Sequence, residues 1–235
     1  ASPGSDPGKI REICKNLSIE AVELRTRESE DVVPYLQELE FEKIMVELPE
    51  DFKKIQASLH VIFQAYVDEL RNRKVFYGFP SKTELIKLQK KLMLSIAKGN
   101  KNFNNLLAAS ACAQAVRLQY ALELLETQTL ASFHKYLQRL AHQAEKKANK
   151  GIVRLVAKPE FSFALRKSEE LLSINKEHPK IDSLKKIIES EFAKNEKAKA
   201  IVFSQYRETA RILCKTLNLL PRIRAKIFIG QATKS

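Results

Sequence analysis

Residues 104–128 read NNLLAASACAQAVRLQYALELLETQ, and this stretch decides the fold class. Its Ala, Leu and Val side chains occur most of the way round a helix of that length, instead of along one narrow stripe. A helix that is apolar on nearly every side is stable only when other elements cover it. The stretch therefore predicts the central helix of a bundle.

The neighbouring stretches have the pattern of helices that could cover it. Residues 52–70 place apolar side chains at a period of 3.6 residues for about five turns. Ser81 followed by Glu84 is the signature of a capping box, and Gly99 is the expected stop for the helix that follows. With further helices expected at 129–150 and 161–172, residues 50–177 are predicted to form a helical module.

The two flanking regions have a different pattern. AVELRT (21–26) and FEKIMVELP (41–49) are typical of strands, and they follow a helix expected at 10–17. After a helix that begins at Pro179, AIVFS (200–204) and AKIFIG (225–230) are two further expected strands, joined by the helix ETARILCKTL (208–217) in a βαβ unit. The predicted class is mainly α, a helical insertion flanked by partial α/β segments at 1–49 and 178–235.

The charge of the chain is strongly positive and unevenly distributed. The net charge is +13 over 235 residues, yet residues 1–60 hold eight Lys and Arg against thirteen Asp and Glu. The excess of positive charge therefore lies entirely beyond residue 60, which favours contact of that part with a polyanion such as nucleic acid. A solvated, lysine-rich surface with no ligand is the alternative.

Cysteine and histidine give no sign of a metal site or of a disulfide framework. Cys14, Cys112 and Cys214 lie far apart in the sequence, so a reducing, intracellular setting is the simpler inference. The four histidines have no ligand spacing, and we expect packing or surface roles for them. No signal-peptide pattern and no apolar run of membrane-spanning length is found, so a soluble protein is expected.

Short motifs near both ends carry a specific resemblance. ASPGSD (1–6) resembles the third motif of superfamily 2 helicases without its first residue, and IVFSQYRETA (201–210) with GQATKS (230–235) resembles motif IV and the segment after it. Residues 19–49 also look like the segment that closes the first RecA-like domain. Together with the helical insertion, these motifs resemble the archaeal Hef helicases and their relatives, the Fanconi anaemia group M and Mph-type DNA helicases.

The resemblance implies a domain order and an activity. It assigns 1–49 to the end of the first RecA-like domain, 50–177 to a thumb-like insertion and 178–235 to the start of the second RecA-like domain. Members of this family are ATP-driven motors that act on forked or branched DNA in replication-fork repair. The parent enzyme would use ATP and Mg²⁺ in the cytoplasm of an archaeon or the nucleus of a eukaryote.

The chain by itself is expected to bind no ATP and to be inactive. ATP hydrolysis needs a glycine loop with Lys, an acidic pair for Mg²⁺ and an arginine finger. No GxxxxGK[ST] run, acidic box or arginine-finger motif occurs in the sequence, so we expect a piece of a longer helicase. The resemblance gives Ala1 and Ser2 to the motif that couples the ATP site to DNA.

Candidate nucleic-acid contacts fall into three groups. The resemblance gives Gln205, Tyr206, Arg207 and Lys234 to the nucleic-acid side of the second RecA-like domain, where polar side chains suit phosphate contacts. Two clusters in the insertion are rich in basic residues, with Glu84 and Glu145 as their only acids. Their candidate phosphate ligands are Lys87, Lys90, Lys91 and Lys98 in the first, and Lys146, Lys147, Lys150 and Arg154 in the second.

Alternatives remain open at this point. The helical module could chiefly dock a replication or repair protein instead of DNA. Charge alone does not separate DNA from RNA, so the insertion of an RNA helicase is a further reading.

Overall fold

The computed structural model describes residues 6–36, 40–147, 149–195 and 197–230. The chain divides into two compact units, one ending at Met45 and one beginning at Val46. The first unit holds the helix α1 (Pro7–Asn16), where one was expected, and the short 3-10 helix η1 (Val33–Tyr35). Over the described ranges the regular structure is helical, which confirms the predicted, mainly α class.

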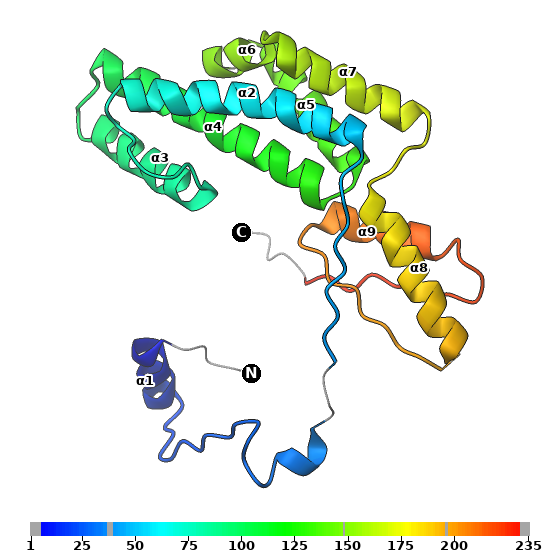
Figure 1. The fold of residues 1–235 in the computed structure, drawn as a ribbon. Coiled ribbons are helices and arrows are strands. Elements are labelled where there is room, and N and C mark those ends of the chain that lie inside the picture. Colours follow the sequence, from blue (N-terminus) through cyan, green and yellow to red (C-terminus); the bar gives the residue numbers. More distant parts are fainter. Residues whose placement is uncertain (1–5, 37–39, 148, 196, 231–235) are drawn as a thin grey trace. The chain divides into compact units, whose positions relative to one another are not determined.

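The described part of the second unit begins with a bundle of six helices (Figure 1). Two segments beyond the bundle are helical as well. In chain order these helices are α2 (Glu50–Asn72), α3 (Lys82–Ala97), α4 (Phe103–Thr127), α5 (Leu130–Glu145), α6 (Lys150–Val156), α7 (Pro159–Ser173), α8 (Pro179–Lys194) and α9 (Arg207–Leu217).

Helix α4 is the centre of the bundle, as its sequence predicts. Helices α2, α3, α5 and α6 all pack against it, and α7 covers α2 and α5 (Figure 1). Ala108, Ala111 and Ala115 are fully buried, and such small side chains let the neighbouring helices approach closely. Leucines complete the core of α4, with Leu118 only 1% exposed.

Side-chain caps fix where the bundle helices begin. The hydroxyl of Ser81 accepts a hydrogen bond from the Glu84 N–H at 3.2 Å, as the capping-box pattern predicts. The Asn102 side chain likewise accepts from the Asn105 N–H at 2.7 Å, where α4 begins. Gly99 has a φ of +96°, a left-handed conformation that suits glycine after the end of α3.

The helix predicted for residues 129–150 forms as α5, but it ends earlier than expected. Helix α5 ends at Glu145, and Lys147 has a φ of +50°, which does not fit a helix. The Asn149 side chain then accepts from the Gly151 N–H at 2.8 Å and starts α6. The residues directly after α5 form a turn, and α6 is a further helix that the sequence did not predict.

The four predicted strands, and with them the βαβ unit, are also not formed. Residues 21–26, 41–49, 200–204 and 225–230 are all described, and none is a strand. A strand exists only when a second strand pairs with its N–H and C=O groups, and no described segment does so here. Several of their large apolar side chains remain exposed, with Phe203 at 91% and Phe228 fully exposed. Only α9, the helix between the last two, forms.

Helix α8 is held against the bundle at its first turn. His178, which caps α8, is 1% exposed, and its ring meets the edge of Phe52 with 5.7 Å between centroids. The ammonium of Lys180 donates to the carbonyl oxygen of Glu126 at 3.0 Å, and Lys176 pairs with Asp51 at 2.8 Å. These contacts join the residues after α7 to the ends of α2 and α4.

No helix within the described ranges is long and apolar enough to cross a membrane.

Removing a central aromatic side chain should destabilise the bundle. Phe133 of α5 is fully buried, so Phe133→Ala leaves a cavity, and we expect the free energy of unfolding to fall by about 3–5 kcal/mol. Urea unfolding followed by circular dichroism measures the change. Val61→Ala, at a 57% exposed position of α2, is the control and should change it by less than about 0.5 kcal/mol.

The buried His178 should make stability depend on pH. Burial, and then the charge of Lys180, lowers the pKa of His178 from 6.5 to about 4. The unfolded chain therefore binds a proton that the folded chain excludes, and stability is lost as the pH falls from about 6.5 to about 4.

His178→Asn isolates this effect, because the amide oxygen can still accept the Lys180 N–H but does not titrate. We expect the variant to lose about 2–3 kcal/mol less stability than the parent between pH 7 and pH 4. Parallel loss in both proteins would contradict the assignment. Urea unfolding at a series of pH values measures the difference.

Candidate nucleic-acid interface

The first lysine cluster lies on the outward face of α3. Leu85, Leu88 and Leu92 turn inward and are at most 9% exposed, so the residues on the opposite side of the helix face solvent. A shallow hollow there is lined by Lys87, Lys90, Lys91, Leu94, Ser95 and Lys98. Lys87 pairs with Glu84 at 2.8 Å, whereas Lys90, Lys91 and Lys98 form no ion pair with another described residue.

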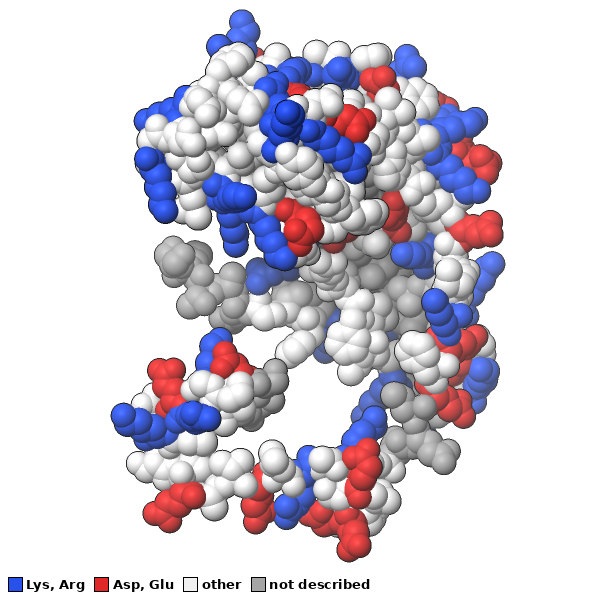
Figure 2. Space-filling view, turned by 60° about the vertical axis from the view of Figure 1, so that its left-hand side comes forward, with Lys and Arg blue, Asp and Glu red and all other residues white. Residues whose placement is uncertain are grey.

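The sequence around this face is nearly free of acidic residues. Between Leu70 and Leu122 the only Asp or Glu is Glu84, and ten Lys and Arg occur in the same stretch. On the face that Figure 2 shows, Lys and Arg side chains outnumber the acidic side chains over the bundle in the upper part of the view. A surface of this kind attracts polyanions.

The second cluster lies around the turn between α5 and α6. Lys146, Lys147 and Lys150 are exposed, and within the described chain none of them forms an ion pair. Their ammonium groups are therefore available to phosphate oxygens. Of the other basic residues nearby, Lys135 pairs with Glu208 at 3.7 Å, and Arg139 lies over the ring of Tyr136 at 5.3 Å.

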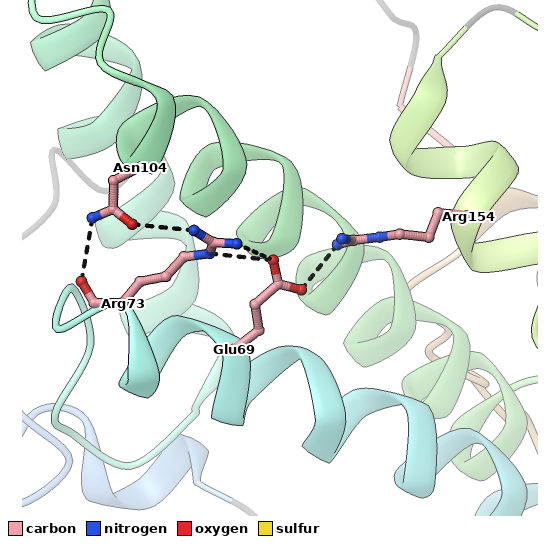
Figure 3. Close-up of polar contacts among 4 residues, drawn as sticks. All are labelled: Glu69, Arg73, Asn104 and Arg154. Carbon is pink, nitrogen blue, oxygen red and sulfur yellow. Dashed lines mark hydrogen bonds and ion pairs between the residues drawn. The ribbon is translucent and has the colours of Figure 1, made fainter.

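Arg154, predicted as a member of this cluster, takes part in a partly exposed network between helices of the bundle (Figure 3). Its guanidinium donates to one carboxylate oxygen of Glu69 at 3.0 Å and lies 5.1 Å from the ring centre of Tyr66. The other oxygen of Glu69 accepts two hydrogen bonds from Arg73, at 3.1 and 3.2 Å. Arg73 also donates to the side-chain oxygen of Asn104 at 3.1 Å, so the network joins α6, α2 and α4.

The residues that resemble motif IV differ from one another in their surroundings. Gln205 is exposed, and Arg207 donates to the carbonyl oxygen of Gly230 at 2.7 Å. Tyr206 is half-buried, and its hydroxyl donates to the Glu123 carboxylate of α4 at 3.1 Å. Burial and the charge of Glu123 raise the pKa of Tyr206, so its hydroxyl stays protonated and serves as a donor.

Glu123 was not singled out from the sequence, although it joins two elements. One of its oxygens accepts from Tyr206 and the other from Lys82 at the start of α3. Nearby, the Thr209 hydroxyl donates to the Gln128 side chain in a buried contact. The structure thus brings α9 onto the end of α4, whereas no hydrogen bond within the described ranges joins Gln205 to the lysines of α3.

Three predicted residues, Ala1, Ser2 and Lys234, lie outside the described residues. Among the described residues, no group of three or more His, Cys, Asp or Glu side chains is arranged to hold a metal ion. His134 instead shares a buried hydrogen bond of 2.8 Å with Ser168.

A family model and several known proteins match the chain. The model described as "Putative ATP-dependent RNA helicase, helical bundle" matches residues 52–178. A "Putative ATP-dependent RNA helicase" of Methanocaldococcus jannaschii is 35% identical across the whole chain, which covers 29% of that relative. An ATP-dependent DNA helicase of Neurospora crassa is 27% identical over 99% of the chain and 21% of its own length.

A solved structure has the same fold. The crystal structure of the Pyrococcus furiosus Hef helicase domain matches the whole chain with a TM-score of 0.76 and 32% identity. The chain covers 49% of that structure and less than a third of the curated relatives just named.

The network of Figure 3 predicts that Arg154 stabilises the fold more than it binds a ligand. Arg154→Ala removes a partner from the Glu69 carboxylate, and we expect a loss of about 1 kcal/mol in the free energy of unfolding. Lys150→Ala, on the same helix and without an ion pair, should leave stability within about 0.5 kcal/mol. Urea unfolding of the two variants distinguishes these roles, and equal effects would argue against the structural assignment.

Proposed function

Because the chain belongs to the helicase helical-bundle family, we propose that residues 50–177 are the DNA-gripping insertion of an ATP-dependent helicase that acts on forked or branched DNA. One observation carries this proposal. Lys90, Lys91 and Lys98 project from one face of α3 with no acidic partner among the described residues. Unpaired lysines on a rigid helix suit the regularly spaced phosphates of a nucleic-acid backbone.

The proposed grip is electrostatic and independent of sequence. Each lysine that neutralises a phosphate releases condensed counterions, so affinity falls as salt rises. Lys87, Lys146, Lys147 and Lys150 add to the same field. Gln205 and Arg207 are proposed to position the strand at the second RecA-like domain, since polar and basic side chains contact phosphates without reading bases.

We propose DNA and not RNA as the substrate because several relatives are DNA helicases. The geometry of the bundle does not distinguish the two. The relatives include ATP-dependent DNA helicases and a Fanconi anemia group M protein homolog of mouse, 25% identical over 99% of the chain. The family model and the Methanocaldococcus jannaschii relative are described as RNA helicases. An RNA arm therefore belongs in the test.

The remaining assignments concern the whole helicase. Residues 1–49 and 178–235 are proposed to belong to its first and second RecA-like domains, which would supply the partners that the exposed apolar segments lack. ATP and Mg²⁺ are proposed for that enzyme because its relatives are ATP-dependent helicases.

Charge reversal on α3 tests the grip. For the variant Lys90→Glu, Lys91→Glu, Lys98→Glu we expect at least a tenfold loss of affinity for a labelled DNA fork at about 0.1 M salt. The slope of log affinity against log salt should also become shallower by about 3. Fluorescence anisotropy over a salt series, with a fork of DNA and one of RNA, gives both quantities.

A matched control separates local from total charge. Lys54→Glu, Arg166→Glu, Lys186→Glu makes the same change in net charge at exposed positions of α2, α7 and α8. We expect this variant to keep most of the parent's affinity. Equal binding by the α3 variant and the parent would refute the proposed grip, and a preference for the RNA fork would assign the insertion to an RNA helicase.

A further inference from the structure

The end of α2 lies beside the start of α4. Residues 73–81 follow α2, and residues 98–102 lead into α4. Arg73 and Asn104 exchange two hydrogen bonds, of 3.1 Å from the Arg73 guanidinium and 3.4 Å to its carbonyl oxygen (Figure 3). Arg73 lies beside Asn104, and the Tyr77 hydroxyl contacts Lys74, so residues 73–77 and 98–104 form one region, which we term the loop end.

The loop end exposes aromatic rings. Tyr77 is 79% exposed and Phe103 76%. An exposed ring forgoes the free energy that burial would supply, so two of them in one region are candidates for contact with a ligand. The sequence alone does not distinguish these rings from buried ones, because exposure follows from tertiary packing.

The rings project from an ordered loop. Phe76 is only 6% exposed and anchors the loop in the core. The Val75 N–H donates to the carbonyl oxygen of Leu70 at 3.2 Å, and the Tyr77 hydroxyl donates to that of Lys74 at 2.9 Å. A ligand that meets preformed rings loses less free energy to ordering.

The two segments of the loop end carry only positive charge, and the nearby acids Asp68 and Glu69 of α2 are paired with Arg71 and Arg73. Neither 73–77 nor 98–104 contains an acidic residue, and Lys74, Lys98 and Lys101 are exposed and form no ion pair within the described chain. Rings that stack on bases, beside lysines that neutralise phosphates, are the combination that binds single-stranded nucleic acid. A duplex hides the faces of its bases, so the rings have stacking partners only where bases are unpaired.

We propose that the loop end binds the unpaired bases of a nucleic-acid strand by stacking on Tyr77 and Phe103. This inference rests on the proposed nucleic-acid function, and it adds the part of the substrate that this end recognises. At a fork, the lysines of α3 would contact the backbone and the loop end the bases of an unpaired arm.

The test compares probes that differ only in their bases. The full chain is titrated with labelled oligothymidylate, oligouridylate, an abasic strand of the same length and a blunt duplex, and anisotropy gives each affinity. For Tyr77→Ala, Phe103→Ala we expect about a tenfold or greater loss on both base-containing single strands. Affinity for the abasic strand and the duplex should stay within about twofold, because the phosphate contacts remain.

Two further variants control for the fold and for the ring. Tyr77→Phe, Phe103→Tyr keeps both aromatic faces and should bind as the parent does, whereas Val61→Ala removes exposed apolar surface elsewhere on α2 and should change nothing. Circular dichroism spectra and thermal melts of all variants check that each is folded.

Several results would overturn the proposal. The parent could bind the abasic strand as tightly as oligothymidylate, or the double alanine variant could lose affinity equally for the duplex. If the double alanine variant bound every probe as the parent does, the proposal would also be wrong. The exposed rings would then be assigned to contact with a protein partner. Failure of the proposed grip has a different signature, since reversal of the α3 lysines would then leave affinity for every probe intact.

Discussion

The need to cover α4 on every side determines the rest of the bundle. A helix with alanines and leucines around most of its surface is unstable in water, so α2, α3, α5 and α6 each bury one of its faces. That packing turns Leu85, Leu88 and Leu92 of α3 inward and leaves its lysines on the solvent side. The same packing brings the end of α2 beside the start of α4. Both proposed binding surfaces therefore follow from one hydrophobic requirement.

Two acidic side chains of the bundle serve its structure. Glu69 accepts hydrogen bonds from Arg73 and Arg154, and Glu123 accepts them from Lys82 and Tyr206. Each carboxylate thus joins helices that lie far apart in the sequence and is satisfied by two donors. Because these acids are engaged in these contacts, they do not neutralise Lys90, Lys91 and Lys98 on the outward face of α3. That face therefore keeps its positive charge.

Local patterns predicted the helices well, and non-local contacts account for most errors. The expected helix at 104–128 differs from α4 by one residue at each end, since caps and periodicity are local signals. The predicted strands failed because strand pairing needs a partner that a single segment cannot reveal. The outward position of the α3 lysines followed from the helical period, but the engagement of Arg154 depends on Glu69, which lies 85 residues away. The turn at Lys147 was missed because a left-handed backbone conformation at lysine leaves little trace in a sequence.

The lysines of α3 that would favour binding of a polyanion also repel one another in the free protein. Lys87 lies three residues before Lys90 and four before Lys91, so like charges are neighbours on one surface of the helix. Their mutual repulsion opposes the hydrophobic contacts that hold α3 on α4. In the proposed grip, a bound polyanion would remove that repulsion and so would stabilise α3. Relief of the repulsion between these lysines would therefore contribute part of the free energy of binding a nucleic-acid strand.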